Sequence, residues 1–365
     1  MRSDLDLVSR PSGTALCLSG GGYRAMLFHA GVLWRLHDAG VLAHVDQVSA
    51  VSGGAITAAA LALGWSHLQD ADAFEDAVVA PLRRLAERTI DVPAGVFGPL
   101  LPGGPGARLA RAYDRYLCGG ATLADLPEAP AFVFNATSLE TGGLWQFGRG
   151  YMAGEIVGRV DTYEVSLASA VAASSAFPPF LAPYRMRLDP HQLRREPWRQ
   201  LQRPPYSERV TLVDGGVYDN LGLEPAWAEH GTVLISDAGA AFDTVPRPPR
   251  DWGRMVLRVL FAIDNQVRSL RRRYVAVAVE RGVRRGASWS IRPGDAAPGV
   301  AGALPSPPHR TRRLADLPTR LRRLSAPTQQ RLVNWGYASC DLGLRADFLP
   351  ELPAPASFPY PTAGI

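Results

Sequence analysis

The stretch Leu16-Cys-Leu-Ser-Gly-Gly-Gly-Tyr-Arg-Ala25 joins an apolar run to a helical pattern through three consecutive glycines. The apolar run is typical of a buried strand, and the segment from Ala25 to Trp34 has apolar side chains at helical spacing. Gly20, Gly21 and Gly22 therefore lie at a strand-to-helix junction. Without β-carbons the chain can turn tightly there and present successive backbone N–H groups. Such a loop can bind an anion or a developing oxyanion, although close packing alone would also explain it.

Strand-like and helix-like segments alternate along the first 245 residues. The predicted strands are Thr14–Leu18, Val45–Val51, Ala131–Ala136, Val210–Val213 and Thr232–Ile235. The predicted helices are Ala25–His37, Ala55–Leu63, Ala73–Ala86 and Ser166–Ser174. Buried strands that alternate with helices indicate an α/β fold whose mostly parallel central sheet is covered on both faces. We therefore expect one α/β domain over residues 10–245.

The C-terminal region, residues 246–365, is basic and rich in proline. Its sequence pattern predicts a long helix from Trp252 to about Val283 and a shorter helix around Leu317–Trp335, with a Gly/Pro-rich passage over Arg292–Pro308 between them. We expect this extension to pack on the same domain as a helical cover.

The composition excludes several kinds of catalytic site. The 365-residue chain contains no lysine, so its 39 basic residues are all arginine. A Walker A loop, a pyridoxal Schiff base and a Ser-Lys pair each need a lysine. The three cysteines, Cys17, Cys118 and Cys340, are far apart and have no clustered histidines, which argues against disulfides and structural zinc. We expect neither a metal nor a cofactor.

The formal net charge of +5 suits an acidic partner. The arginines of the chain cluster at positions 194–195, 271–273, 284–285 and 310–323. Anionic lipid head groups would fit these clusters, and so would a merely solvated surface. No zinc-finger spacing or RNP-like strand predicts nucleic-acid binding. The chain also has no signal-peptide layout and no apolar run of membrane-spanning length, so we expect a cytoplasmic protein with at most peripheral membrane attachment.

A second junction, Val48-Ser-Ala-Val-Ser-Gly-Gly54, has the pattern of a nucleophile elbow centred on Ser52. The turn is so sharp that only small residues fit two positions before and after the serine, and Ala50 and Gly54 meet that demand. The following helix would offer its N-terminal dipole to the serine oxygen. Ser49 is a weaker candidate because it should lie within the strand.

A third constellation begins with Asp214, at the end of an apolar strand, and continues with Gly215 and Gly216. An isolated Asp-Gly turn usually carries no chemistry. Here the glycine loop, the serine elbow and the Asp-Gly-Gly turn all follow strands of one predicted sheet, at the edge where α/β proteins build their sites. The three motifs together predict a catalytic centre.

Histidine is the usual base for a serine hydrolase. The seven candidates are His29, His37, His44, His67, His191, His230 and His309. His29 falls in the first predicted helix and His309 in a Pro/Arg-rich loop, and none of the seven sits in a loop after the last strands in the way that the histidine of an α/β-hydrolase does. Direct proton transfer from Ser52 to Asp214 is therefore the simplest assignment. A Ser-His-Asp triad, with Asp214 or Asp237 orienting a histidine, remains the alternative.

These motifs resemble those of the patatin-like phospholipases, over roughly residues 14–240. Ser19–Arg24 resembles the family's G-G-G-x-R-G loop, Ala50–Gly54 its GxSxG elbow, and Asp214–Gly216 its D-G-G/A motif. Ala172–Phe180 resembles the stretch that the family has between nucleophile and acid. The chain departs from the pattern in having Ala50 for the first elbow glycine and alanine after the loop arginine.

The resemblance implies a three-layer α/β/α patatin-type fold and a Ser-Asp dyad. Ser52 would attack an ester carbonyl, Asp214 would take its proton, and the amides of Gly20, Gly21 and Gly22 would hold the oxyanion. Gly54, Gly215 and Gly216 would support the two turns. Arg24 would fix the loop, meet a phosphate or form a structural ion pair.

The implied substrate is a phospholipid or lysophospholipid, reached at an anionic membrane surface on which arginine-rich helices dock. An activating protein partner is compatible with this scheme. Two other functions are compatible with the same motifs: a Ser-His-Asp esterase acting on soluble esters, and a non-catalytic lipid-binding protein of the same fold.

Overall fold

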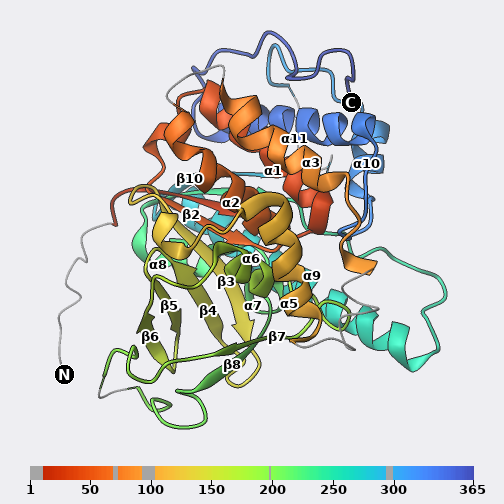
Figure 1. Cartoon of the computed structure of the whole chain (residues 1–365). Coiled ribbons are helices and arrows are strands. Elements are labelled where there is room, and N and C mark those ends of the chain that lie inside the picture. The colour runs from red at the N-terminus through yellow and green to blue at the C-terminus, as the bar shows by residue number, and fades with distance from the viewer. Residues whose placement is uncertain (1–10, 69–72, 93–102, 197–198, 293–298) are drawn as a thin grey trace, which may run out of the picture.

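A ten-stranded sheet with helices on both faces forms the centre of the protein in the computed structural model, which describes residues 11–68, 73–92, 103–196, 199–292 and 299–365 (Figure 1). The strand order is β10-β9-β1-β2-β3-β4-β5-β6, and β8 pairs with both β3 and β7. The strands are β1 Thr14–Leu18, β2 Gln47–Val51, β3 Ala131–Ser138, β4 Leu144–Gly148, β5 Tyr151–Gly154, β6 Gly158–Asp161, β7 Tyr184–Arg187, β8 Arg209–Asp214, β9 Thr232–Asp237 and β10 Arg285–Ser290.

Five neighbouring strands, β10, β9, β1, β2 and β3, are parallel to one another. β1 lies between β2 and β9, where its residue Leu16 is opposite Val48 and Leu234. The remaining pairs, from β3 to β4 through to β6 and from β3 through β8 to β7, are antiparallel. The predicted parallel sheet flanked by helices is therefore confirmed, and an antiparallel part extends it beyond β3.

Alternate residues of β1 separate the two helical layers. Leu16 and Leu18 belong to the larger core, which includes α1, α2 and α11, whereas Ala15 and Cys17 pack in a smaller core with residues of α8 and α9. The principal helices are α1 Gly22–Asp38, α2 Gly53–Gly64, α3 Ala80–Ala86, α5 Gly104–Tyr113, α6 Leu167–Ser174, α7 Gly216–Asp219, α8 Leu223–Glu229, α9 Trp252–Glu280, α10 Pro308–Ala315 and α11 Ala326–Asp347. Helix, sheet and helix thus form three layers, as the resemblance implied.

Residues after 245 contribute to the same sheet and the same core. β10 pairs with β9, and α11 lies along α1, where Figure 1 shows the blue helix beside the red one. Arg35 of α1 donates two hydrogen bonds to Asp341 of α11, at 2.8 and 2.9 Å. The long helix predicted from Trp252 is confirmed. The helix predicted over Leu317–Trp335 is wrong at both ends, because it begins at Ala326 and continues to Asp347.

Among the helices that the structure describes, none combines the length and the apolar character needed to cross a bilayer. Cys17, Cys118 and Cys340 are free and buried.

Candidate active site

The ends of β2 and β8 meet head to head along β3. Val51, the last residue of β2, is opposite Asn135, while Asp214, the last residue of β8, is opposite Ala136. Because β2 is parallel to β3 and β8 is antiparallel to it, the two strands run toward each other. Ser52 therefore lies beside Asp214. Asp214 thus ends an apolar strand, as expected, and β8 is one of the antiparallel strands of the sheet.

Ser52 occupies a strained turn between β2 and α2. Its φ of 51° and ψ of −114° make it the one non-glycine residue of the described chain with a positive φ. Such a conformation persists only where the surroundings enforce it. A β-carbon on Gly53 would lie 2.4 Å from the carbonyl oxygen of Gly22, and one on Gly54 would lie 2.3 Å from that of Leu18. The elbow fits because both following residues lack side chains.

The backbone amides of the glycine loop and of Gly53 lie around this turn. The N–H of Gly20 donates to the carbonyl of Asn220 at 3.1 Å, so this amide is already engaged. In the described part of the chain, the amides of Gly21, Gly22 and Gly53 have no such partner. They lie at the starts of α1 and α2, where helices leave their first N–H groups unpaired. The three amides could therefore hold an oxyanion, with Gly53 replacing Gly20 in the expected set.

The side chain of Asp214 is buried, with 3% of its surface exposed, and its surroundings change its pKa. Burial above all raises its pKa to about 7, and the charge of Asp264 adds to that effect. Hydrogen bonds from the Gly216 amide, at 2.8 Å, and from the Ser52 hydroxyl act in the opposite direction. Gly215 has no room for a β-carbon, which would lie 2.3 Å from the Asn135 carbonyl oxygen. A carboxylate with this pKa is suited to act as a general base near neutral pH.

Two cavities meet at Ser52 and Asp214. The larger, of about 260 Å³, is lined mostly by apolar groups, including Phe177, Phe180 and Leu181. The smaller, of about 60 Å³, is lined on one side by Leu260, Phe261 and Ile263 of α9. Phe177 lines both cavities and stacks on Phe261, with ring centroids 5.9 Å apart.

A segment of the C-terminal region forms part of the wall of the larger cavity. Thr319, Arg320 and Leu321 line it, and the Arg320 carbonyl accepts a hydrogen bond from the Tyr23 amide at 3.0 Å. The buried Arg24 side chain donates to the carbonyls of Leu317 and Ala238 and to the Thr319 hydroxyl. Its guanidinium therefore fixes the glycine loop and this segment together. The sequence offered no motif by which Thr319–Leu321 could have been found.

Histidines are absent from the linings of both cavities, and all seven lie in the described chain. His29 is fully buried, where its Nε2 donates to the Ser19 carbonyl at 2.9 Å and its Nδ1 lies 2.8 Å from the Ser236 hydroxyl. Burial lowers the pKa of His29 to about 4, so this side chain is neutral. Asp237, the other carboxylate considered for a triad, forms ion pairs with Arg268 and Arg272.

Two further polar residues at the site escaped the sequence analysis. The Ser174 hydroxyl accepts a hydrogen bond from the Ser52 amide at 2.9 Å, and the Asn220 side chain lines the smaller cavity beside Asp264. Ser174 lies within the stretch Ala172–Phe180 noted above, where nothing distinguished it from its neighbours, and Asn220 follows the Asp214–Gly216 motif by four residues. The described residues contain no group of three or more His, Cys, Asp or Glu side chains that could hold a metal ion.

Comparison with known proteins gives one family and several distant structures. Residues 16–227 match the family model described as Patatin-like phospholipase. The solved structure of human GIVD cytosolic phospholipase A2 is 16% identical, with a TM-score of 0.47, over 65% of this chain and 47% of that chain. VipD from Legionella pneumophila is 15% identical, with a TM-score of 0.38, over 91% of this chain and 66% of that chain. The chain thus spans about half the length of the human protein. No curated protein matches it.

Proposed function

The chain belongs to the patatin-like phospholipase family, and we propose that it is a serine lipid acyl hydrolase that cleaves carboxylic ester bonds of phospholipids or lysophospholipids. Family membership supports hydrolysis of lipid esters. The observation that carries the finer proposal is the strained Ser52 beside the buried Asp214, at the junction of two largely apolar cavities.

In the proposed reaction, Ser52 and Asp214 form a catalytic dyad. The Ser52 oxygen attacks the ester carbonyl carbon while Asp214 accepts the hydroxyl proton. Collapse of the tetrahedral intermediate breaks the ester bond, and Asp214 returns the proton to the leaving alcohol. Water then attacks the acyl-enzyme and gives a proton to Asp214. The second tetrahedral intermediate breaks the bond to Ser52, Asp214 returns the proton to the Ser52 oxygen, and the fatty acid leaves. Because no histidine lines either cavity, Asp214 is the base that the geometry favours.

The oxyanion is assigned to the free amides of Gly21, Gly22 and Gly53. A donor of this kind stabilises a transition state by about 3 kcal/mol. Gly20 instead ties the loop to Asn220. Gly54 and Gly215 allow the two turns to approach β1 and β3, and Gly216 leaves room for the Asn220 side chain. Arg24 holds the glycine loop in place.

The larger cavity is proposed to bind the acyl chain of the substrate. Its aromatic and aliphatic lining suits a hydrocarbon, and Ser52 and Asp214 are also among its lining residues. A substrate with such a chain resides in a membrane, so the proposal includes peripheral contact with an anionic lipid surface.

Release of fatty acid from phosphatidylcholine and lysophosphatidylcholine vesicles tests the proposal. Ser52→Ala and Asp214→Asn should each reduce release by about a thousandfold or more, because each removes one member of the dyad. Ser357→Ala and Asp347→Asn make the same chemical changes at exposed positions and should retain wild-type release.

Two outcomes would contradict the dyad. Retained activity in Asp214→Asn, together with a large loss in one of the seven His→Ala variants, would support a Ser-His-Asp esterase. Vesicle binding by the wild-type protein without release of fatty acid from any lipid would support a non-catalytic lipid-binding protein.

A further inference from the structure

Helix α9 presents apolar side chains to solvent along one side. Eight of them are 43–77% exposed: Trp252, Met255, Val256, Val259, Ile263, Leu270, Tyr274 and Val277. Apart from the adjacent Met255 and Val256, they follow one another at spacings of three, four or seven residues, which places them on one face of the helix. We name this face the α9 stripe. At 1.5 Å per residue the stripe is roughly 38 Å long.

The opposite side of α9 carries charges that face the body of the protein. Arg268 is 4% exposed and lies 3.5 Å from Asp237. Arg271 forms ion pairs with Asp219 and Glu224, at 3.6 and 2.7 Å. These arginines fix the orientation of the helix and leave its apolar face outside. A surface helix normally has the reverse arrangement, so the exposed stripe calls for a covering partner.

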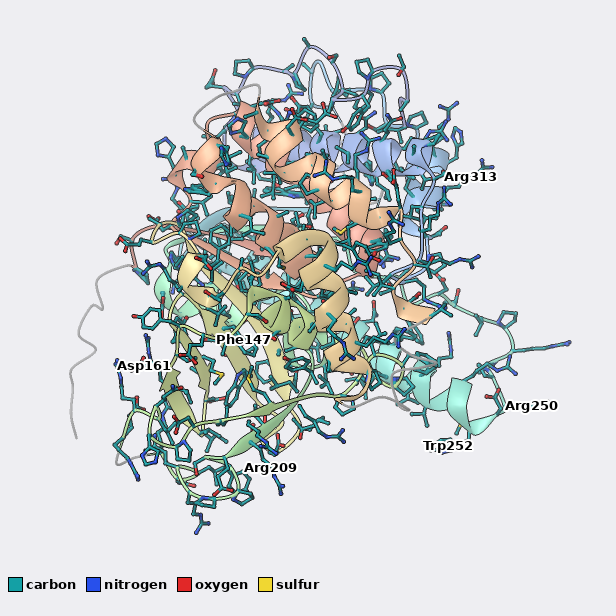
Figure 2. The ribbon with its side chains drawn as sticks, in the orientation of Figure 1. Phe147, Asp161, Arg209, Arg250, Trp252 and Arg313 are labelled. Atoms are coloured by element: carbon teal, nitrogen blue, oxygen red, sulfur yellow. The ribbon has the colours of Figure 1, made fainter. Side chains whose placement is uncertain are left out.

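The N-terminal end of α9 projects from the body of the protein. Figure 2 shows Arg250 and Trp252 at this outer end, away from the sheet. Three exposed arginines lie there, Arg247, Arg250 and Arg254, and they outnumber the two exposed carboxylates of Asp243 and Asp251. Arginines beside an apolar helical face are typical of segments that lie in the interface of an anionic bilayer.

The α9 stripe continues into the proposed active site. Ile263 belongs to the stripe and also lines the smaller cavity, together with Leu260 and Phe261. Phe180, which lines the larger cavity, is 60% exposed. An apolar path therefore leads from the outer face of α9 to Ser52. A second protein molecule would have no need of this continuity, whereas a lipid that leaves a bilayer would use it.

We propose that the α9 stripe inserts into the interfacial region of an anionic phospholipid bilayer and delivers lipid to the cavities at Ser52. This inference rests on the proposed lipid hydrolase function and identifies the surface through which it acts. The inward-facing arginines hold α9 in the docking orientation, and the outer arginines contact the head groups.

Vesicle binding by the Ser52→Ala protein tests the inference without hydrolysis. The probe is partition onto vesicles of phosphatidylcholine with phosphatidylglycerol, measured by flotation, beside vesicles of phosphatidylcholine alone. Adding Val259→Asp places a charge within the stripe and should weaken vesicle binding about tenfold or more. The variant loses an apolar group that the bilayer would bury, and its carboxylate would have to lose water on insertion. Val283→Asp is the matched control, since Val259 and Val283 are 53% and 52% exposed and Val283 lies beyond α9. It should bind like its parent.

A soluble short-chain ester separates docking from catalysis. With Ser52 restored, Val259→Asp and Val283→Asp should hydrolyse this ester at the wild-type rate, and only Val259→Asp should be slow on vesicles. Equal vesicle binding by both variants would overturn the docking proposal, and so would a parent protein that ignores anionic vesicles. A parent dimer that Val259→Asp converts to monomer without any change in vesicle binding would also overturn it. Vesicle binding with no ester hydrolysis would overturn the proposed function and leave the docking surface standing.

Discussion

At the scale of single residues, the pKa of Asp214 sets the proposed pH dependence. A general base must be ionised, and burial raises the pKa of Asp214 to about 7. We expect kcat/KM for a soluble ester to fall tenfold per pH unit below about pH 7. Removing the negative charge of Asp264, which raises this pKa, should move the acidic limb to lower pH. Profiles of wild type and Asp264→Asn measure the shift, and the exposed Asp347→Asn should leave the limb in place. An unmoved limb in Asp264→Asn would contradict the assignment.

The buried Asp214 carboxylate should also lower the free energy of unfolding at pH values where it is ionised. Its pKa is higher in the folded chain than the ordinary value, so its contribution is most favourable below about pH 4 and is lost as the pH rises through about 7. Three pH units correspond to about 4 kcal/mol. Asp214→Asn should therefore be inactive yet melt at a higher temperature than wild type at pH 8, with the difference vanishing near pH 4.

Asp125→Asn provides a control of opposite sign for these melting experiments. Hydrogen bonds from Thr122 lower the pKa of Asp125, so its charged form is stabilising and its replacement should lower the melting temperature at pH 8. An Asp214→Asn protein less stable than wild type at pH 8 would show that the buried charge is compensated.

At the scale of elements, the sequence predicted those strands that are buried on both faces. β1 is mostly apolar, β2 has apolar residues at three of its five positions, and a glycine-containing turn follows each strand, so local pattern was sufficient. The strands β4, β5 and β6 have only four or five residues and include glycine and polar side chains, which weakens the pattern. The direction of β8 could not be read locally either, because it depends on pairing with β3, more than 70 residues earlier.

Helix α9 illustrates a second limit of local pattern. Its length was predicted from its sequence, and its arginines suggested a basic docking face. Three of these arginines instead form ion pairs with carboxylates of other elements. Arg268 and Arg272 pair with Asp237, and Arg271 pairs with Asp219 and Glu224. Which side of the helix faces outward therefore follows from these distant carboxylates. The three motifs at the proposed active site could be read in advance because each is complete within a few residues.

At the scale of the whole molecule, the C-terminal region completes a site whose motifs all precede it. Thr319–Leu321 line the larger cavity, α9 lines the smaller one, and β10 and α11 extend the sheet and core. No motif marks these residues, since their role depends on shape and backbone hydrogen bonds. We propose that residues on both sides of position 245 unfold together, as one cooperative unit.

The contact between α1 and α11 tests this cooperativity. A β-carbon on Gly336 would lie 1.8 Å from the carbonyl oxygen of Phe28, and one on Gly31 equally close to that of Val333. Gly336→Ala must push the two helices apart, so it should lower the free energy of unfolding by at least about 2 kcal/mol. Gly253→Ala, at a helical glycine whose β-carbon would lie in ordinary contact with Asp251 Oδ1 at 3.9 Å, should be neutral or slightly stabilising. In thermal unfolding followed by both circular dichroism and tryptophan fluorescence, Gly336→Ala should show one transition at a reduced midpoint. Two separated transitions, with the first one alone displaced, would instead mean that the C-terminal region folds as a domain of its own.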